Sequence, residues 1–439
     1  MRTLDAMTYL TNFTDRLRKS ELVNDSFWAI FGNVLGKGLS LSAAIIIARI
    51  LGKEVYGELG IVGGTIGTFI IFSNFGLNYT TTKYIAEYKK TKPELLPQII
   101  KSCQKLTMIF SGISTLALFL VADYVAVYLL KSPKFSFPLR LIAISILFGS
   151  LCRTQTGILA GFGKFKELAK INTIIGVITF VSGILLTYLY SFIGALMALM
   201  IMHIMNYLLN KYFINQQIKS AETNIREKFS VKEILNFSIP VALQEAFYSV
   251  ITYSFGLLLV QYSNYGEVGL NSAAVYWSAI ILFIPGILRN VILSHLASNL
   301  SDKKRHIRIL RIILLFNFSI TFFLSVIIYF LSDYIVLSYG DNFSGLKDVV
   351  NISVFTTIFV SMSNVYAQAY MSENKNWLML IFRILRDSSI LIIAFYLINE
   401  NNGVNGALSL AKSALFSNII FLALMSIVYE LKLKRKHNS

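Results

Sequence analysis

Long apolar runs constrain the fold of this chain more than any other feature. Hydrophobic residues make up 55% of the 439 positions and charged residues only 14%, whereas about a quarter of the residues in a soluble domain are charged. Runs of about twenty apolar residues recur from one end of the sequence to the other, and each is long enough to cross a bilayer as a helix. The sequence therefore predicts an all-α membrane protein.

We expect twelve transmembrane helices in two halves of six around a central cavity. The predicted spans are 26–50, 57–80, 104–130, 139–163, 168–190, 193–214, 232–260, 267–293, 308–331, 349–371, 377–398 and 403–428. They divide the chain into a cytoplasmic N-terminal segment (1–25), an N-terminal half (26–214), a cytoplasmic linker (215–231), a C-terminal half (232–428) and a basic cytoplasmic tail (429–439). The separation of the fifth span from the sixth rests on the turn region at Gly194.

Two short motifs recur at nearly the same spacing. Tyr56-Gly57-Glu58-Leu59-Gly60-Ile61 returns as Tyr265-Gly266-Glu267-Val268-Gly269-Leu270, and Gly194-Ala195-Leu196 returns as Gly406-Ala407-Leu408. Both shifts are close to half of the chain. Either echo alone would be weak, but together they indicate a duplicated half. Internal repeats of this kind are found in transporters, whose substrate sites lie between the repeats.

The distribution of lysine and arginine predicts the orientation in the membrane. The net charge is +17, and basic residues crowd the connections on one side of the predicted spans. The connections on the other side hold only Lys53, Lys131, Lys134 and Lys347. Because cytoplasmic loops carry the excess of positive charge, we expect both termini in the cytoplasm.

Several cations fall inside the predicted spans. Each costs at least about 2.5–3.5 kcal/mol at the bilayer centre, so such residues face a wet interior or a partner. Arg49 and Arg140 lie near the outer ends of their spans, where they can reach the interface. The remaining candidates for a cationic cavity that binds an anionic head group are Lys37, Arg153, Arg289, Arg383, Arg386 and Lys412.

Internal ion pairing is the alternative explanation for these cations. Arg383 and Asp387 are four residues apart on one predicted helix and can pair, which leaves Arg386 over. Lys37 and Arg153 have no acid in their own spans, and the one deep acid elsewhere is Glu245. Glu245 is therefore a candidate for coupling to H⁺ or Na⁺, and equally a structural partner for Lys37 or Arg153.

Signatures of catalysis, of metal binding and of nucleic-acid binding are absent from the sequence. Gly157-Ile-Leu-Ala-Gly-Phe-Gly-Lys164 resembles a phosphate-binding loop, but its spacing is one residue too long and Phe165 stands where Ser or Thr is needed. No cluster has the spacing of metal ligands. We therefore expect a non-enzyme with no cofactor beyond a coupling ion.

Short motifs along nearly the whole chain resemble those of polysaccharide repeat-unit flippases of the Wzx type, in the MOP exporter superfamily that also includes the MATE exporters. The motifs are Arg49-Ile-Leu-Gly52 before Tyr56-Gly57, Asn74-Phe-Gly-Leu77, Lys83-Tyr-Ile-Ala-Glu87, Gly157-Ile-Leu-Ala-Gly161 before Lys164-Phe-Lys166, Ser238-Ile-Pro240, Leu282-Phe-Ile-Pro285 and Tyr339-Gly340-Asp-Asn-Phe343. The chain departs from the family at Ser294-His295, where a proline often follows the eighth span.

The resemblance implies a fold and a substrate. It implies two six-helix halves with alternating access, and spans 1, 2, 7 and 8 lining the cavity and its lateral gates. The implied substrate is an undecaprenyl-diphosphate-linked oligosaccharide, passed to the outer leaflet for O-antigen (lipopolysaccharide), capsule or another polymer. A polysaccharide polymerase and a chain-length regulator are the implied protein partners.

Three alternatives remain open at this point. A MATE-like exporter of small cationic molecules would need an acidic cavity, whereas this one is predicted to be basic. A lipid II flippase of the same superfamily commonly carries two further spans. A membrane-embedded polymerase would need catalytic groups on a sizeable outer loop, which the predicted spans do not leave.

Overall fold

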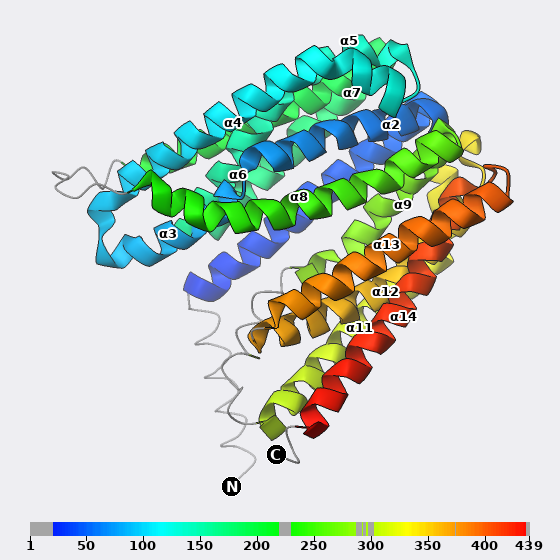
Figure 1. Cartoon of the computed structure of the whole chain (residues 1–439). Coiled ribbons are helices and arrows are strands. Elements are labelled where there is room, and N and C mark those ends of the chain that lie inside the picture. Colours follow the sequence, from blue (N-terminus) through cyan, green and yellow to red (C-terminus); the bar gives the residue numbers. More distant parts are fainter. Residues whose placement is uncertain are drawn as a thin grey trace, which may run out of the picture. The chain divides into compact units, whose positions relative to one another are not determined.

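The structure is a computed structural model that describes residues 21–218, 230–286, 292, 296, 303–373 and 375–435. All regular secondary structure in these ranges is helical (Figure 1). The predicted linker at 215–231 falls largely outside the described residues, as does the predicted end of the eighth span.

The first two predicted spans form one long, interrupted helix. Helix α2 (Glu21–Asn74) contains a non-helical residue at Gly52, whose φ of 73° suits glycine far better than other residues. The helix ends at Asn74, and the positive φ values of Phe75 and Gly76 turn the chain into α3 (Leu77–Thr91). The prediction that the second span continues to residue 80 is therefore wrong by one turn and a half of helix, because this turn intervenes.

The next predicted spans also contain breaks. Helix α4 (Leu96–Tyr124) runs into a short π-helical segment (Val125–Leu129). Helices α5 (Ser136–Ile142) and α6 (Ile144–Phe162) follow each other in a single apolar stretch that is bent by 46°.

Helix α7 (Phe165–Ile218) is broken where a turn was predicted. Its non-helical residue is Ser191, with φ 51° and ψ −130°. A Cβ atom on Gly194 would lie 1.8 Å from the carbonyl oxygen of Leu186, so the chain can double back at this point only because residue 194 has no side chain. The separation of the fifth and sixth spans thus has a physical basis at these residues.

The second half continues the same pattern of long helices. Its elements are α8 (Val231–Tyr262), α9 (Tyr265–Ile281), α11 (Lys303–Tyr339), α12 (Leu346–Ser372), α13 (Asn376–Glu400) and α14 (Gly406–Arg435). Asn264 caps the start of α9, where its side-chain oxygen accepts a hydrogen bond from the Glu267 amide at 3.0 Å.

Seven of the described helices are long and apolar enough to cross a membrane, or eight if the bent α5–α6 pair is one span. Two of the seven, Gly32–Asn74 and Phe165–Gln217, contain the breaks at Gly52 and Ser191. Helix α9 is too short to be among them, at 17 residues. Helix α13 is also not among them, because three charged residues lie in its first half. The number of twelve spans stays a prediction, whereas the multi-span helical architecture is confirmed.

Internal contacts divide the described chain into two compact units. The first unit contains the described residues up to Ala44, together with Val62–Tyr128 and Ser132–Val250. The second contains Ile45–Ile61, Leu129–Lys131 and the described residues from Ile251 onward. The turn of α2 at Gly52 therefore packs with the second unit.

A central helix organises the packing of each unit. In the first unit, α6 contacts α3, α4 and α7, and in the second unit α12 contacts α9, α11, α13 and α14 (Figure 1). Over half of the most apolar stretch of α12 is buried (56%), against 17–28% for the other spanning helices. Residues on α12 are therefore the most enclosed of any span in the described chain.

Candidate functional site

An arginine and a glutamate from two different helices meet in the first unit. Arg153 on α6 places one guanidinium nitrogen, Nη2, 3.4 Å from Oε2 of Glu245 on α8. Tyr79 on α3 reaches the same carboxylate, with its hydroxyl 3.5 Å from Oε1. Helices α3, α6 and α8 therefore meet at one charged cluster. The sequence predicted its Arg153–Glu245 contact only as an alternative to ion coupling by Glu245.

The Arg153–Glu245 contact is loose. Its nitrogen–oxygen distance is well above the 2.7–2.9 Å of a strong charge-assisted hydrogen bond. The arginine side chain is 36% exposed and the glutamate 27% exposed. The Nε atom of Arg153 is buried and has no hydrogen-bond partner among the described residues. A guanidinium held by one long contact retains other N–H groups that can bind an oxyanion.

Local sequence explains why Tyr79 and Glu245 come together. Gly76, which begins α3, has a φ of 69° and would carry a Cβ atom 3.0 Å from the carbonyl oxygen of Ser238 and 3.1 Å from the amide nitrogen of Ala242. Glycine at this position lets the start of α3 approach α8 closely. Helix α8 also contains Pro240, one turn before Glu245, where a proline removes a backbone hydrogen bond.

The other predicted cavity cations lie on three further helices. Lys37 on α2 belongs to the first unit and its side chain is exposed. In the second unit, Arg383 on α13 is half-buried and Lys412 on α14 is exposed. Arg289 lies outside the described residues. The structure therefore brings together Arg153 and Glu245, and it distributes the remaining candidates over both units.

Arg386 is held as an internal ion pair. Its Nε lies 2.8 Å and its Nη2 2.7 Å from Oδ1 of Asp387, and the side chains of the pair are only 19% and 7% exposed. The four-residue spacing on one helix predicted a pair between Asp387 and Arg383 and gave Arg386 no partner. In the structure Arg386 contacts the Asp387 carboxylate. This contact favours the alternative explanation, internal ion pairing, for Arg386.

Two cations near the ends of spans, Arg140 and Lys347, form ion pairs with nearby aspartates. Arg140 pairs with Asp123 at 2.6 Å, with both side chains well exposed. Lys347 pairs with Asp333 at 2.6 Å at the junction of α11 and α12. Neither pair lies in an enclosed site, as expected for cations near the ends of spans.

No group of three or more His, Cys, Asp or Glu side chains that could hold a metal ion occurs in the part of the chain that the structure describes. Glu245, the candidate for ion coupling, has an arginine and a tyrosine as its recorded partners. In that environment the carboxylate can exchange a proton or change its ion-pair partner.

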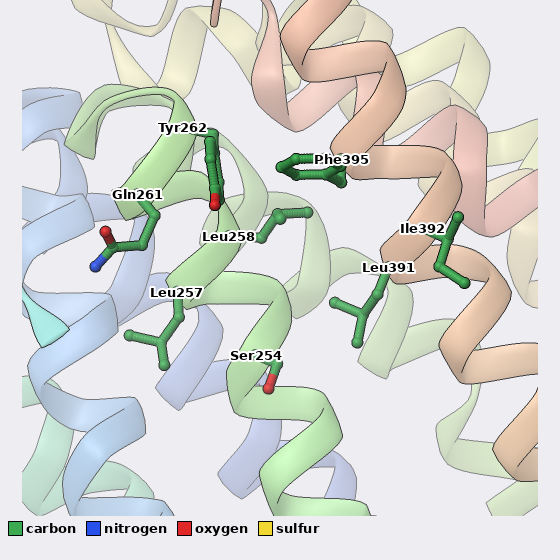
Figure 2. Close-up of a pocket in the computed structure, with 8 residues that line it drawn as sticks. All are labelled: Ser254, Leu257, Leu258, Gln261, Tyr262, Leu391, Ile392 and Phe395. Carbon is green, nitrogen blue, oxygen red and sulfur yellow. The ribbon is translucent and has the colours of Figure 1, made fainter.

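An apolar groove lies in the second unit between α8 and α13. Figure 2 shows Tyr262 facing Phe395 across it, with ring centroids 4.9 Å apart. The lining residues are Ser254, Leu257, Leu258, Gln261, Tyr262, Leu391, Ile392 and Phe395. None of these eight is charged, so the groove is suited to hydrocarbon and not to an anionic head group.

Two features of the structure had no signal in the sequence. Tyr79 was not expected at the charged cluster, because tyrosines are common at the ends of spans. A buried histidine–tyrosine contact between α11 and α14 was also missed, since His306 lies within a basic segment that was interpreted as a connection between spans.

Comparison with known proteins places the chain in a family. The model of the polysaccharide biosynthesis protein family matches residues 22–294. The uncharacterized membrane protein MJ1375 of Methanocaldococcus jannaschii is 22% identical over 285 residues, which cover 60% of this chain and 66% of that protein. The chain thus aligns with slightly less than two thirds of the length of this relative.

Solved structures share the fold over nearly the whole chain. A multidrug resistance MATE family transporter of the MOP superfamily, in an inward-facing conformation, superposes with a TM-score of 0.73 at 14% identity, covering 92% of this chain and 99% of the other. The lipid II flippase MurJ, in an inward closed conformation, gives 0.72 at 15% identity, covering 93% and 87%.

A third structure is a MOP superfamily transporter from Pyrococcus furiosus, described as having a binding pocket of reverse polarity. It gives a TM-score of 0.66 at 14% identity and covers 92% of this chain and 94% of the other. These likenesses confirm the fold of the MOP superfamily predicted from the sequence. Because the family model covers more than half of the sequence, this chain belongs to the polysaccharide biosynthesis protein family.

Proposed function

We propose that this protein is a flippase for lipid-linked oligosaccharides. In this proposal an undecaprenyl-diphosphate-linked repeat unit enters from the inner leaflet of a bacterial cytoplasmic membrane and leaves into the outer leaflet by alternating access. Both chain termini lie in the cytoplasm. A polysaccharide polymerase and a chain-length regulator would use the product on the outer side.

Family membership supports the class of substrate. The matched family takes its name from polysaccharide biosynthesis, and one of the similar folds is described as a lipid II flippase. Flipping is a step of such a pathway that a multi-span helical protein of this fold can perform. A lipid-linked sugar is therefore the substrate that agrees best with both the family and the fold.

The partly exposed Arg153 side chain is the observation that carries the proposal. A diphosphate cannot cross hydrocarbon without groups that replace its lost water. Arg153 lies on α6, the longer helix of the bent α5–α6 pair, with its side chain 36% exposed and its contact to Glu245 stretched to 3.4 Å. An arginine fork of this kind binds phosphate oxygens in pairs. Lys37, in the same unit and exposed, adds a second positive charge.

The charge of these side chains disfavours export of cationic drugs. A cation is held by carboxylates, and the one carboxylate of the Arg153 cluster is already paired. The reversed polarity described for the Pyrococcus furiosus transporter is a precedent for a pocket of different charge on the same fold. Lys412 and Arg383 in the second unit, and Arg289 from the sequence, stay further candidates for cations that bind the head group.

The direct test is transport by the purified full-length protein in proteoliposomes. A fluorescent undecaprenyl-diphosphate oligosaccharide is placed in the membrane, and its protection from a membrane-impermeant quencher is followed over time. We expect the wild-type protein to equilibrate the two leaflets, and Arg153→Ala to slow this at least tenfold. Arg140→Ala is the matched control, because Arg140 is an exposed, ion-paired arginine at the end of a span, and it should transport normally.

Three results would contradict the proposal. Proteoliposomes in which the lipid-linked sugar does not change leaflet would do so, as would equal rates for Arg153→Ala and Arg140→Ala. Uptake of a cationic dye in place of the lipid-linked sugar would support the drug exporter instead. In cells, deletion of the gene should cause lipid-linked repeat units to accumulate on the inner leaflet.

A further inference from the structure

The guanidinium of Arg153 is only half used by its ion pair. Nε and Nη2 of an arginine lie on one edge of the planar group, and their N–H bonds fit two oxygens of a single oxyanion. In Arg153, Nη2 is 3.4 Å from Oε2 of Glu245, whereas Nε is buried and has no hydrogen-bond partner among the described residues. Glu245 therefore occupies one position on an edge that has two.

A second arginine in the chain shows the same edge fully paired. Nε and Nη2 of Arg386 lie 2.8 and 2.7 Å from Oδ1 of Asp387, and both side chains are largely buried. These distances are those of charge-assisted hydrogen bonds. The Arg153–Glu245 contact is longer and involves one nitrogen alone, so Glu245 is the weaker of the two carboxylate partners.

Tyr79 attracts the Glu245 carboxylate from another helix. Its hydroxyl, on α3, lies 3.5 Å from Oε1, the second oxygen of the carboxylate. The neighbouring residue Thr80 fixes α3 against α8, because its hydroxyl makes a buried contact of 2.7 Å with the hydroxyl of Ser238. The carboxylate thus stands between two donors and is held tightly by neither.

We propose that Glu245 is an internal competitor for the anion that Arg153 binds. In the empty protein its carboxylate occupies Nη2. An arriving phosphate group places two oxygens on Nε and Nη2, and the Glu245 side chain withdraws toward Tyr79. The inference deepens the proposed function, on which it rests for the identity of the anion, a lipid diphosphate. All three residues belong to the first unit.

An internal competitor serves both the empty site and the release of the anion. A partly buried guanidinium without a partner is costly, and Glu245 lowers this cost while the site is empty. Binding along a transport pathway must be firm enough for entry and weak enough for departure. A carboxylate that returns to Arg153 favours departure of the phosphate group, and Tyr79 keeps the carboxylate near while the phosphate group is bound.

The first measurement is the affinity of the purified full-length protein for inorganic diphosphate, by isothermal titration calorimetry in mild detergent. Glu245→Gln removes the charge of the competitor and keeps the size of its side chain. We expect its Kd for diphosphate to fall about fivefold, the effect of a half-exposed ion pair that no longer competes. Asp123→Asn is the matched control, because it removes a carboxylate from the exposed pair with Arg140, and its Kd should equal that of the wild-type protein.

Two further variants show whether the gain in affinity passes through Arg153. Arg153→Ala combined with Glu245→Gln should lose the gain, because the edge that binds the phosphate group is gone. Glu245→Asp keeps the negative charge on a side chain that is one methylene group shorter and reaches Arg153 less well. We expect its affinity to lie between those of the wild-type protein and Glu245→Gln, whereas long-range repulsion alone would leave it at the wild-type affinity.

Tyr79→Phe tests the role of the tyrosine hydroxyl as a positioning group. Without it the carboxylate settles closer to Arg153, so diphosphate should bind about two- to threefold more weakly, as for the loss of a weak hydrogen bond. The same change in the Glu245→Gln background should have no further effect. Tyr84→Phe is the matched control and should bind normally, because its hydroxyl joins the same two helices through the carbonyl oxygen of Glu233 at 3.3 Å.

These results are separable from those on flipping. Unchanged or weaker diphosphate binding in Glu245→Gln or Glu245→Asp, or a gain that persists without Arg153, would overturn the inference, as would the absence of diphosphate binding from all of these proteins. The measurements use neither a membrane nor a lipid substrate. The expected affinities in a protein that does not flip lipid-linked sugars would therefore refute the proposed function alone, and Arg153-dependent flipping with an unchanged affinity of Glu245→Gln would refute the inference alone.

Discussion

A Cβ atom on Gly57 would lie 1.8 Å from the carbonyl oxygen of Tyr265. The approach is repeated one turn further along α9, where a Cβ atom on Gly269 would lie 2.1 Å from the carbonyl oxygen of Lys53. Gly57 and Gly269 belong to the two copies of the repeated hexapeptide. The copies therefore pack backbone against backbone within the second unit, which small residues permit and larger ones prevent.

Alanine at position 57 should destabilise the protein. The added methyl group would force the helices apart or out of register, and overpacking of this kind costs about 1–3 kcal/mol. The higher helix propensity of alanine offsets only about 1 kcal/mol of this cost. Thermal unfolding of the detergent-solubilised protein should show a lower midpoint for Gly57→Ala. Gly63→Ala is the matched control, because a Cβ atom there has nothing within 4 Å, and it should be neutral or stabilising.

A buried amide anchors α2 to α6 in the first unit. Asn74 is 2% exposed, and its Nδ2 donates to Oγ1 of Thr154 at 2.9 Å and to the carbonyl oxygen of Ser150 at 3.2 Å. Thr107 on α4 shares the Thr154 hydroxyl at 2.8 Å. The motif Asn74-Phe-Gly-Leu77, noticed in the sequence, thus has a packing role: its asparagine joins the helices and its glycine makes the turn.

Asn74→Ala should therefore lower stability by about 1–3 kcal/mol, because the Ser150 and Thr154 acceptors would stay buried without their donor. Asn172→Ala is the control. Asn172 also donates to a neighbouring side chain, Asn33, at 2.6 Å, but in an exposed position, where water can replace the lost partner. Chemical denaturation in mild detergent compares the two variants. A loss for Asn172→Ala as large as that for Asn74→Ala would contradict this account.

The fold was largely predictable because its causes are local. Apolar runs of the right length mark spanning helices, and the breaks at Gly52 and Ser191 lie where the sequence showed a turn. The repeated hexapeptide predicted a duplicated half, and its two copies turned out to touch. The early end of α2 at Asn74 was missed, since Phe75, Leu77 and Tyr79 continue the run of apolar and aromatic residues past the turn.

The site was less predictable because it depends on which side chains meet. The sequence offered Lys37 and Arg153 as equal partners for Glu245, and the structure shows Arg153 on α6 in contact with Glu245 on α8. The Arg386–Asp387 pair was missed because helical spacing rules ignore consecutive residues. His306 gave no signal at all, as its partners are the carbonyl oxygen of Leu296 and the hydroxyl of Tyr429 on α14.

Two ion pairs in the chain should differ sharply in their contribution to stability. Asp387→Asn leaves the guanidinium of Arg386 in a position that is only 19% exposed, and breaking a buried pair costs about 3–5 kcal/mol. Glu245→Gln affects a half-exposed contact of 3.4 Å, where the loss should be below about 1 kcal/mol. The unfolding midpoints of both variants compare these two losses of stability. A Glu245→Gln protein as unstable as Asp387→Asn would show that the Arg153 cluster is structural.

The Arg153 cluster also predicts how transport responds to its driving force. With an inside-negative membrane, each negative charge moved outward gains about 2.3 kcal/mol per 100 mV, so dissipating the potential should slow the flipping of a lipid diphosphate. If Glu245 in addition exchanges a proton, Glu245→Gln should remove the response to a pH gradient while the response to the potential remains. Proteoliposomes with imposed potassium and proton gradients separate the two. Flipping that is indifferent to both gradients would rule out this energetic account, and an unaltered pH response in Glu245→Gln would leave Glu245 as a partner of Arg153 alone.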